Sequence, residues 1–409
     1  MSKRFISFYG DDFTGSTDVM EALASHGIKT ALFTRIPTPE EFEPFKYHEA
    51  IGIAGTSRSQ TPQWMNENLP RVFEWLKSLG ARFCHYKVCS TFDSSPEIGS
   101  IGRAIEIGLK TFNQPNVSMI IGAPQLKRYT FAGHLFAAYQ SQTYRIDRHP
   151  VMSKHPVTPM QESDLAIHLS HQTTQHVNLI DVFDDKTQIA AGGELLALGE
   201  NYLPFIAGSS GVEYALMKSF KNKRSTFPNL PSVEKLLVVS GSVSPTTERQ
   251  IRHALQNGFG GIEVDALALS RSDKGETARI IKLACEILEK GQSPLIYSAL
   301  GSASDKGQEL NAMARQLLSS NLGDIAKHCI TQFKLKRVVI AGGDTSSHAL
   351  GQLNISALIT RFPLAQTPGS PLCTAYSSDP IFNGLEIAMK GGQVGHDDYF
   401  VRLKDGISA

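Results

Sequence analysis

Cysteine, net charge and long apolar runs are all scarce in this sequence. The 409 residues include five cysteines (Cys84, Cys89, Cys285, Cys329 and Cys373), and no pair has the C-x-x-C spacing of a zinc or redox site. We therefore expect reduced thiols and no zinc site. The 40 Lys and Arg residues nearly balance the 39 Asp and Glu residues, so the chain lacks the overall field that would attract nucleic acid or an anionic membrane.

Membrane segments and the common nucleotide fingerprints are also missing. Apolar runs such as Val338–Ala341 are much shorter than the roughly 20 residues of a membrane helix, and Met1–Arg4 leads into a strand-like run rather than a signal peptide. Neither a Walker loop, G-x-x-x-x-G-K-[ST], nor a Rossmann G-x-G-x-x-G occurs. These absences favour a cytoplasmic protein with no membrane or nucleic-acid partner, and they disfavour P-loop and dinucleotide-binding enzymes.

Strand-like and helix-like runs alternate along the chain, which predicts an α/β fold with mainly parallel sheets. The expected strands and helices include Phe5–Tyr9, Ser16–His26 and Thr30–Phe33, then Leu236–Ser240, Pro245–Asn257, Leu295–Ser298 and Arg337–Ala341. Between the two series, residues 221–232 are basic and then contain Pro, Asn and Ser, which is typical of a surface linker. We therefore expect two α/β domains, residues 1–225 and 226–409.

The first candidate site is the turn Gly10–Asp18, which follows the first strand and opens a helix. Ligands of open α/β sheets bind at the carboxyl ends of the strands. Asp11 and Asp12 would repel each other unless they met a cation or a substrate hydroxyl, and Thr14 and the amides of the helix start can hold an anion or a polyol. The simpler alternative is that Asp12 or Thr14 only caps the helix.

A second cluster, Tyr86–Pro96, again ends a strand-like run in hydroxyl residues, and a helix is expected over Ile98–Leu109. Lys87 is suited to face a carboxylate or a transferring phosphate, against the alternative of an exposed Lys in an ordinary turn. Arg128 is suited to pair with a sugar-acid carboxylate, against the alternative of a surface ion pair. His149 and His155 are separated by a proline and lack the i, i+4 spacing of metal ligands, so we expect no metal site there.

Three turns in the second half carry small residues where anions bind. Ser240–Pro245 ends a strand and opens a helix, which lets backbone amides approach an anion. Ala341–Ser347 repeats this arrangement with two glycines, an acid and three hydroxyls. Met389–Asp398 combines a lysine with three glycines, of which a helix C-cap would explain one.

These motifs resemble those of the four-carbon acid sugar kinase family, formerly a domain of unknown function, over nearly the whole chain. Asp11–Asp18 is similar to the family's D-D-F-T-G-[AS]-x-D signature, and Ser240–Thr246 is similar to its G-S-x-S-x-x-T turn. Residues 341–346 and 390–395 resemble its G-G-[DE]-T-[SA] and K-S-G-N-F-G elements. The resemblance implies an N-terminal acid-sugar domain, a C-terminal nucleotide domain and an active-site cleft between them.

The implied activity is phosphorylation of a hydroxyl of a small aldonate or oxo-aldonate with ATP and Mg²⁺. Asp12 and Lys87 are the expected catalytic residues, with Asp12 as acceptor of the hydroxyl proton. The expected substrate ligands are Asp11, Thr14, Ser90, Thr91, Asp93 and Arg128, and the expected nucleotide ligands are Ser242, Ser244, Gly342, Gly343, Asp344, Thr345, Gly392 and Gly395. Which acid is the base and which residues hold a metal stay open.

One departure from the family bears on the substrate. Where members read K-K-x-D-S-T-x-R-G, this chain has Cys89 in place of the acid and Asp93 in place of the arginine. Exchanging a guanidinium for a carboxylate changes which acids a pocket accepts, so a four-carbon aldonate, an oxo-tetronate and a branched acid such as an oxo-isoapionate all stay open. A non-catalytic sensor and a sugar-acid oxidoreductase or isomerase are the alternatives. The expected partners are the sugar acid and ATP, and homo-oligomer formation is left open.

Overall fold

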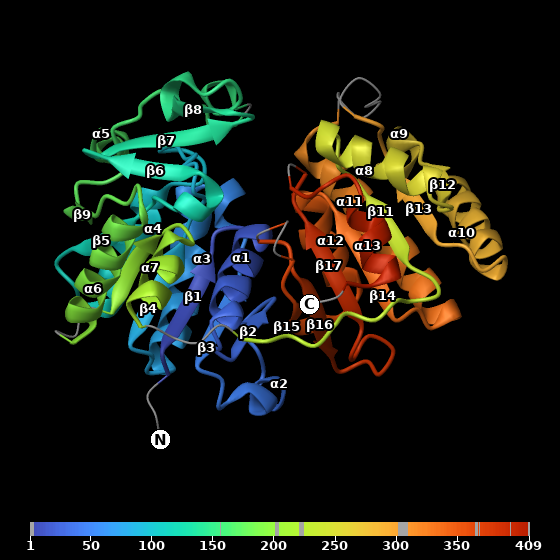
Figure 1. Cartoon of the computed structure of the whole chain (residues 1–409), viewed down its shortest axis with the longest axis horizontal. Coiled ribbons are helices and arrows are strands. Elements are labelled where there is room, and N and C mark those ends of the chain that lie inside the picture. Colours follow the sequence, from blue (N-terminus) through green and yellow to red (C-terminus); the bar gives the residue numbers. More distant parts are fainter. Residues whose placement is uncertain are drawn as a thin grey trace. The chain divides into compact units, whose positions relative to one another are not determined.

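The computed structural model describes residues 4–155, 157–200, 204–220, 225–301, 310–364, 367, 369–392 and 394–407, the side chains at 312, 344 and 347 apart. The chain divides into two compact units, Met1–Ser225 and Thr226–Ala409. Lys221–Arg224, the basic start of the expected linker, lie outside the described residues. Each unit is an α/β domain built on a largely parallel sheet, which confirms the expected fold class (Figure 1).

The first unit is built around a parallel sheet with the strand order β2-β3-β1-β4-β10-β5-β9. Its strands are β1 (Ile6–Gly10), β2 (Thr30–Phe33), β3 (Ala50–Ala54), β4 (Phe83–Lys87), β5 (Val117–Ile120), β9 (Val177–Leu179) and β10 (Phe205–Gly208). Its helices are α1 (Phe13–Ser25), α2 (Pro39–Phe42), α3 (Pro62–Ser78), α4 (Ile101–Phe112), α5 (Leu165–Ser170), α6 (Asp185–Glu200) and α7 (Gly211–Ser219). Because β1 lies between β3 and β4, the loops after these three strands meet at one edge of the sheet.

Alternation along β4 separates the two faces of this sheet. Tyr86 packs edge to face against Phe73 of α3, whereas its neighbour His85 points to the opposite face and bonds to Glu213 of α7. Helices α3 and α4 pack together on the first face, and α1 and α7 pack together on the second. Lys87 follows Tyr86, so it lies on the same face as His85, over α1 and α7.

A separate antiparallel sheet comprises β6 (Arg128–Phe131), β7 (His134–Tyr139) and β8 (Gln142–Arg145). We did not expect it from the sequence. Its β6–β7 turn places Ala132 at φ 51° and Gly133 at φ 78°, as a two-residue hairpin turn requires. The Thr130 amide donates to the Val182 carbonyl (2.9 Å), which ties the small sheet to the rest of the unit.

The second unit has the strand order β12-β13-β11-β14-β17-β16-β15, parallel from β12 to β17 and antiparallel at β16 and β15. Its strands are β11 (Leu237–Ser240), β12 (Gly260–Glu263), β13 (Pro294–Tyr297), β14 (Arg337–Ala341), β15 (Ile355–Phe362), β16 (Leu372–Ser377) and β17 (Glu386–Lys390). Its helices are α8 (Pro245–Gln256), α9 (Ala266–Leu269), α10 (Lys274–Glu289), α11 (Ala312–Phe333), α12 (Gly343–Gln352) and α13 (Tyr399–Asp405). Strands β11, β14 and β17 are neighbours in the sheet, so the loops that follow them all begin at one edge.

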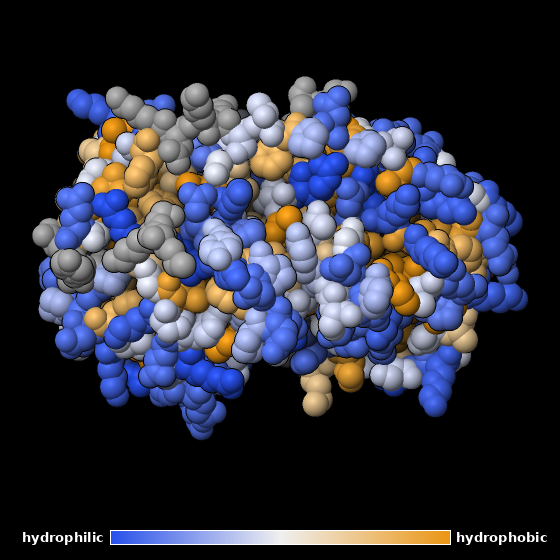
Figure 2. Space-filling view, turned by 90° about the horizontal axis from the view of Figure 1, so that it is seen from below, coloured by the Kyte–Doolittle hydropathy of each residue, from blue (hydrophilic) through white to orange (hydrophobic). Residues whose placement is uncertain are grey.

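The apolar residues of the strands and of one face of each helix form the cores. In the second unit, Val238 and Val339 of the central strands pack with Ile251 of α8 and Phe400 of α13. Exposed apolar side chains are scattered, and the face shown in Figure 2 is mostly hydrophilic. Across the described residues, we find no helix of the length and hydropathy that crossing a bilayer requires.

Candidate functional site

The turn after β1 forms the centre of the candidate site in the first unit. Helix α1 begins at Phe13, three residues earlier than expected, because Asp12 is its N-cap: Asp12 Oδ1 accepts from the Gly15 amide at 2.8 Å. Asp12 therefore does cap the helix, as the simpler alternative predicted. Asp12 does more than cap, because both of its oxygens also accept hydrogen bonds from Arg58.

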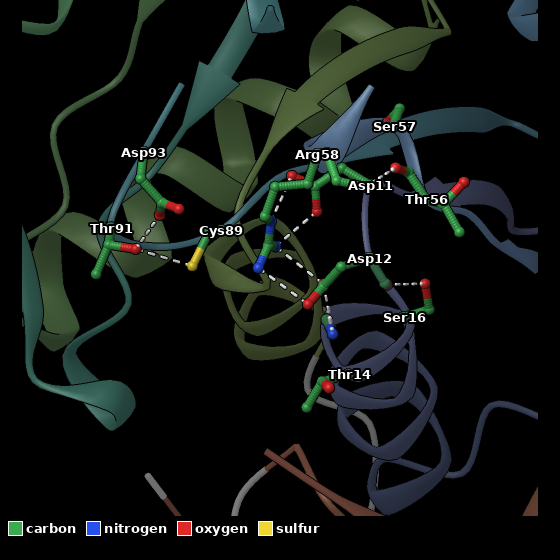
Figure 3. A network of polar contacts seen from close by, with 12 residues as sticks. Asp11, Asp12, Thr14, Ser16, Thr56, Ser57, Arg58, Cys89, Thr91 and Asp93 are labelled. Carbon is green, nitrogen blue, oxygen red and sulfur yellow. Dashed lines mark hydrogen bonds and ion pairs between the residues drawn. The ribbon is translucent and has the colours of Figure 1, made fainter. Parts of the chain in front are cut away.

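Arg58 lies between the two aspartates (Figure 3). Its Nη1 and Nη2 donate to Asp12 Oδ2 and Oδ1, both at 2.9 Å. Nη2 and Nε donate to Asp11 Oδ1 and Oδ2 at 2.7 and 3.1 Å. The arginine backbone is fixed as well, since its amide donates to the Asp11 carbonyl at 3.0 Å. This clamp supplies the cation that two adjacent carboxylates need.

Burial sets the electrostatics of the clamp. Asp11 is 4% exposed, and the loss of solvation raises its pKa, although Arg58 opposes the shift. Burial would lower the pKa of Arg58, but the charges of Asp11 and Asp12 outweigh it and raise that pKa well above its usual value. The guanidinium is therefore a fixed positive charge, and about a quarter of its side chain is open to solvent (25%).

Lys87, the last residue of β4, brings a second cation to this turn. Its side chain is 3% exposed, and a Cβ placed on Gly15 would lie 2.6 Å from Lys87 Nζ and 2.5 Å from Asp12 Oδ1. Glycine at position 15 is thus what lets the ammonium and the carboxylate approach the first turn of α1 together. The two predicted catalytic residues, Asp12 and Lys87, lie side by side.

Buried acidic groups of α1 and α7 lie on the Lys87 side of the sheet. Asp18 interacts electrostatically with Lys87, and burial raises the pKa of the Asp18 carboxyl despite that attraction. Farther along the same face, His85 Nδ1 lies 2.7 Å from Glu213 Oε1, and both side chains are fully buried. Carboxyl groups of α1 and α7 therefore lie on the same face of the sheet as Lys87.

The segment Cys89–Asp93 borders the clamp on its other side (Figure 3). Thr91 Oγ1 donates to Asp93 Oδ1 at 2.5 Å and lies 2.9 Å from Cys89 Sγ. Between them the buried Phe92 has φ 60°, a left-handed conformation that costs a bulky residue about 1–3 kcal/mol. Burial raises the pKa of Cys89, so its thiol is protonated and is no nucleophile at neutral pH.

The remaining predicted substrate residues differ in how closely they join this cluster. Arg128, the first residue of β6, lies within electrostatic reach of Cys89, and its buried Nε has no hydrogen-bond partner among the described residues. Ser90 is half-buried in the loop after β4. Thr14 lies in the first turn of α1, outside the hydrogen bonds drawn in Figure 3.

In the second unit, the loops after β11 and β17 are joined by hydrogen bonds. The Ser242 hydroxyl donates to Thr247 Oγ1 (3.0 Å), and Thr247 donates to the Gly392 carbonyl (3.2 Å). Ser244 is the N-cap of α8, where it accepts from the Thr246 amide at 3.2 Å. A Cβ on Gly392 would lie 3.0 Å from Ser242 Oγ, so the glycine permits this close packing.

The loop after β14 closes the same group. Gly342 has φ 117°, and a Cβ there would lie 3.0 Å from Thr345 Oγ1 and 3.4 Å from the Ser242 amide nitrogen. Gly343 begins α12, and the side chain of Asp344 lies outside the described residues, as does Gln393. Gly395 has φ 97° and packs against Gln250, away from the Ser242–Gly392 contacts.

Two residues at these sites escaped the sequence reasoning. Arg58 lies in Gly55–Ser59, a turn of small and hydroxyl residues after β3, and that context could have identified it. Lys390 was noted as part of its motif but not as a ligand, yet it is fully buried and donates to Thr247 Oγ1 at 2.9 Å. Nothing in the residue type of a lysine signals such burial.

Metal-ligating residues do not cluster in the part of the chain that is described: no group of three or more His, Cys, Asp or Glu side chains is arranged to hold an ion. The five cysteines are free thiols.

Comparisons with known proteins cover both units. A sugar-binding N-terminal domain model matches residues 6–216, and a nucleotide-binding C-terminal domain model matches residues 237–400. A 3-oxo-isoapionate kinase of Paraburkholderia graminis is 39% identical, over 98% of this chain and 94% of the relative. A 3-oxo-tetronate kinase of Cupriavidus necator is 26% identical, over 95% and 94%. A crystal structure of a Salmonella typhimurium protein, 23% identical, has the same fold, with a TM-score of 0.78 over 97% of this chain and 98% of that one.

Proposed function

The chain belongs to the four-carbon acid sugar kinase family, and from this premise we propose that it transfers the γ-phosphoryl group of ATP to a hydroxyl of 3-oxo-isoapionate or a closely related branched oxo acid. The observation that carries the choice of substrate is the 39% identity over nearly the full length of the 3-oxo-isoapionate kinase, compared with 26% for the 3-oxo-tetronate kinase of Cupriavidus necator.

The cations of the first unit support binding of a sugar acid. A sugar acid offers a carboxylate and several hydroxyls, and a planar guanidinium pairs with a carboxylate through two parallel hydrogen bonds. Arg128 has a buried Nε that lacks an acceptor. Arg58 is ionised and partly open to solvent, and one of its five N–H groups remains after the four bonds to Asp11 and Asp12. A buried donor left unpaired is costly, so an acceptor on the ligand would stabilise the site. Arg58 and Arg128 supply the guanidinium charge that Asp93 removes relative to the family motif.

Asp12 and Lys87 are the proposed catalytic pair. Phosphoryl transfer depends mainly on positioning and charge stabilisation, so the base has little bond-breaking to do. Asp12, which accepts hydrogen bonds from Arg58 and the Gly15 amide, is assigned to accept the hydroxyl proton of the substrate. Lys87 lies beside Asp12 and stabilises negative charge on the transferring group. Asp11 holds Arg58 in place for the acid, and Thr14, Ser90, Thr91 and Asp93 are proposed to select its hydroxyls.

The second unit fits the phosphates of ATP. Glycines 342 and 392 let the three loops approach one another, and the amino termini of α8 and α12 follow two of these loops. Ser242, Ser244, Gly342, Gly343, Asp344, Thr345, Gly392 and Gly395 are the proposed ligands. Bound Mg²⁺ would neutralise charge on the phosphates, and it is commonly held by those phosphates and one or two carboxylates rather than by a full protein cage. The described residues offer no such cage, which agrees with an ion that arrives with ATP.

The test is release of ADP from ATP·Mg with a panel of 3-oxo-isoapionate, 3-oxo-tetronate and threonate. We expect the highest kcat/KM with the branched oxo acid. If every acid left ATP intact in the presence of the folded protein, the proposed activity would be wrong. If 3-oxo-tetronate were the best acceptor, only the choice of acid would fail.

A variant of Arg58 tests how the acid is held. Arg58→Lys keeps the charge but loses the fork that holds Asp11 and Asp12 and the remaining N–H that can reach the acid, so the KM for the acid should rise about tenfold or more. Arg35→Lys is the matched control, because Arg35 also pairs with a carboxylate, Glu41, but does so on the exposed surface (2.6 Å). An unchanged KM in Arg58→Lys would exclude Arg58 from binding the acid.

A further inference from the structure

Lys390 is a lysine without exposed surface in the middle of the proposed phosphate site. It ends β17 and is paired in register with Ala341 of β14. Its exposed fraction is 0%. Its Nζ donates to Thr247 Oγ1 and to the Gly391 carbonyl, both at 2.9 Å. Both acceptors are uncharged, so the contacts around Lys390 do not compensate a positive charge.

The number of hydrogen bonds indicates the protonation state. A neutral lysine amine has two N–H groups and a lone pair, whereas an ammonium has three N–H groups. Two acceptors satisfy both N–H groups of the neutral amine, whereas they leave one N–H of an ammonium unpaired. Thr247 cannot offer its own hydrogen to the amine, because its hydroxyl already donates to the Gly392 carbonyl. The observed contacts therefore match the uncharged form.

The charged groups that the structure describes on the neighbouring elements do not pair with Lys390. On α8, Glu248 pairs with Arg252 at 2.8 Å. On β14 and β17, Arg337 pairs with Glu386 at 2.6 Å, at the other end of both strands. The remaining titratable groups on α8, α12 and the loop after β17 are Arg249, which pairs with Asp397, and His253, His348, His396 and Asp398. Within the described residues none of them makes an ion pair with Lys390, and the side chain of Asp344 lies outside them.

Burial has the corresponding effect on the titration of the amine. It lowers the pKa of Lys390 from its ordinary value to about 7, and desolvation is the cause. Among the described side chains, no carboxylate offsets the loss of water. A phosphate group would do so, because it would provide both a negative charge and an acceptor for the third N–H.

We propose that Lys390 is mainly an uncharged amine in the free protein at pH 8 and takes up close to one proton when the polyphosphate of a nucleotide binds beside it. This inference rests on the proposed nucleotide site of the second unit. The lone pair of the amine accepts the proton from solvent, and the third N–H then donates to a phosphate oxygen. The protein thereby keeps its phosphate site free of unpaired charge until an anion arrives.

The coupling has a definite size. With a free pKa of about 7, roughly 0.9 proton is taken up per nucleotide bound at pH 8. Affinity should fall as pH rises, by about 50-fold between pH 7 and pH 9, provided that the bound lysine has an ordinary or higher pKa. Nucleotide phosphates are already fully ionised above pH 8, so they add little to this uptake.

The experiment is calorimetry of ADP·Mg binding to the full-length protein at pH 8, in buffers of differing ionisation enthalpy. The slope of the apparent binding enthalpy, plotted against the ionisation enthalpy of the buffer, gives the number of protons taken up per nucleotide bound. We expect about 0.9 for the native protein, and none for Lys390→Met, which has similar length and no titratable group. Lys282→Met in α10, where the lysine side chain is 78% exposed, is the matched control and should retain the uptake.

A second measurement uses the native protein alone. The outcomes below separate a failure of this inference from a failure of the proposed function. The Kd of ADP for the native protein, followed from pH 7 to pH 9, should rise about 50-fold. Binding without proton uptake, or a Kd independent of pH, would overturn the inference and leave the kinase proposal intact. Uptake that persisted in Lys390→Met or vanished in Lys282→Met would assign the proton to another group. Failure of the folded native protein to bind any nucleotide would overturn the proposed function, and the inference with it.

Discussion

Replacing Gly15 by alanine should disable catalysis without unfolding the protein. The new Cβ would lie 2.5 Å from Asp12 Oδ1 and 2.6 Å from Lys87 Nζ, where ordinary contact begins at 3.4 Å. The carboxylate and the ammonium must therefore retreat by 0.9 and 0.8 Å, the differences between those distances. Both atoms end flexible side chains, so they can move without disturbing the backbone. A displacement near 1 Å in a catalytic group costs about 10²-fold in rate.

The free energy of unfolding of Gly15→Ala should equal or exceed that of the native protein. Gly15 is in the first turn of α1 and has no positive φ, so alanine fits its backbone and gains up to about 1 kcal/mol of helix propensity. The matched control is Gly193→Ala in α6, where a Cβ would meet nothing within 4 Å. Both variants should keep or raise the native melting temperature, and only Gly15→Ala should lose kcat.

The assay is steady-state ADP release with the best acid acceptor, together with calorimetry of ADP binding. We expect kcat of Gly15→Ala to fall about 10²-fold while nucleotide affinity stays unchanged, because the nucleotide ligands belong to the other unit. Native kcat in Gly15→Ala would refute the reasoning, since it would mean that Asp12 and Lys87 need not occupy the positions that glycine leaves open. Loss of the fold would contradict the geometry of the turn.

Further substitutions separate the roles of the two units. Asp12→Asn keeps the shape of the cap but cannot take a proton as a carboxylate does, so kcat should fall by roughly 10²–10⁴ with nearly unchanged ADP affinity; an effect on KM alone would make Asp12 only a substrate ligand. Gly342→Ala forces a side chain into φ 117°, at a cost of about 1–3 kcal/mol in the free energy of unfolding, and should weaken ADP binding in calorimetry. Gly351→Ala in the same helix has open space at its Cβ, so it should leave ADP affinity at the native value.

Local sequence patterns were sufficient to predict the bounds of two strands. Thr30–Phe33 and Arg337–Ala341 form strands with the predicted bounds, because both are continuous apolar or β-branched runs that a parallel sheet buries on both faces. Helix α1 starts earlier than predicted because the cap Asp12 precedes Phe13 and Thr14, which the apolar pattern alone does not assign to a helix. The small sheet of β6, β7 and β8 was missed, since its short strands have mixed polarity and are held by pairing with one another.

The site was partly predictable for the same reason. Asp11, Asp12 and Lys87 follow strand-like runs directly, and adjacent strands bring their carboxyl ends together. Arg58 comes from the loop after β3, and only the pairing of β3 with β1 reveals that its guanidinium reaches the aspartates. The charge state of Lys390 depends on the desolvation and hydrogen-bond count of its surroundings, which are properties of the packed structure rather than of a motif.

Arg128 and Asp12 lie on different sheets of the first unit. Asp12, Arg58 and Lys87 project from three adjacent strands of the main sheet, whereas Arg128 opens a hairpin sheet with its own turns. Insertions or exchanges within residues 124–155 can therefore reshape the surroundings of Arg128, a proposed ligand of the acid, while the proposed phosphoryl-transfer groups keep their positions. In a fold divided in this way, substitutions in the small sheet can change which acceptor is bound, while the main sheet preserves turnover.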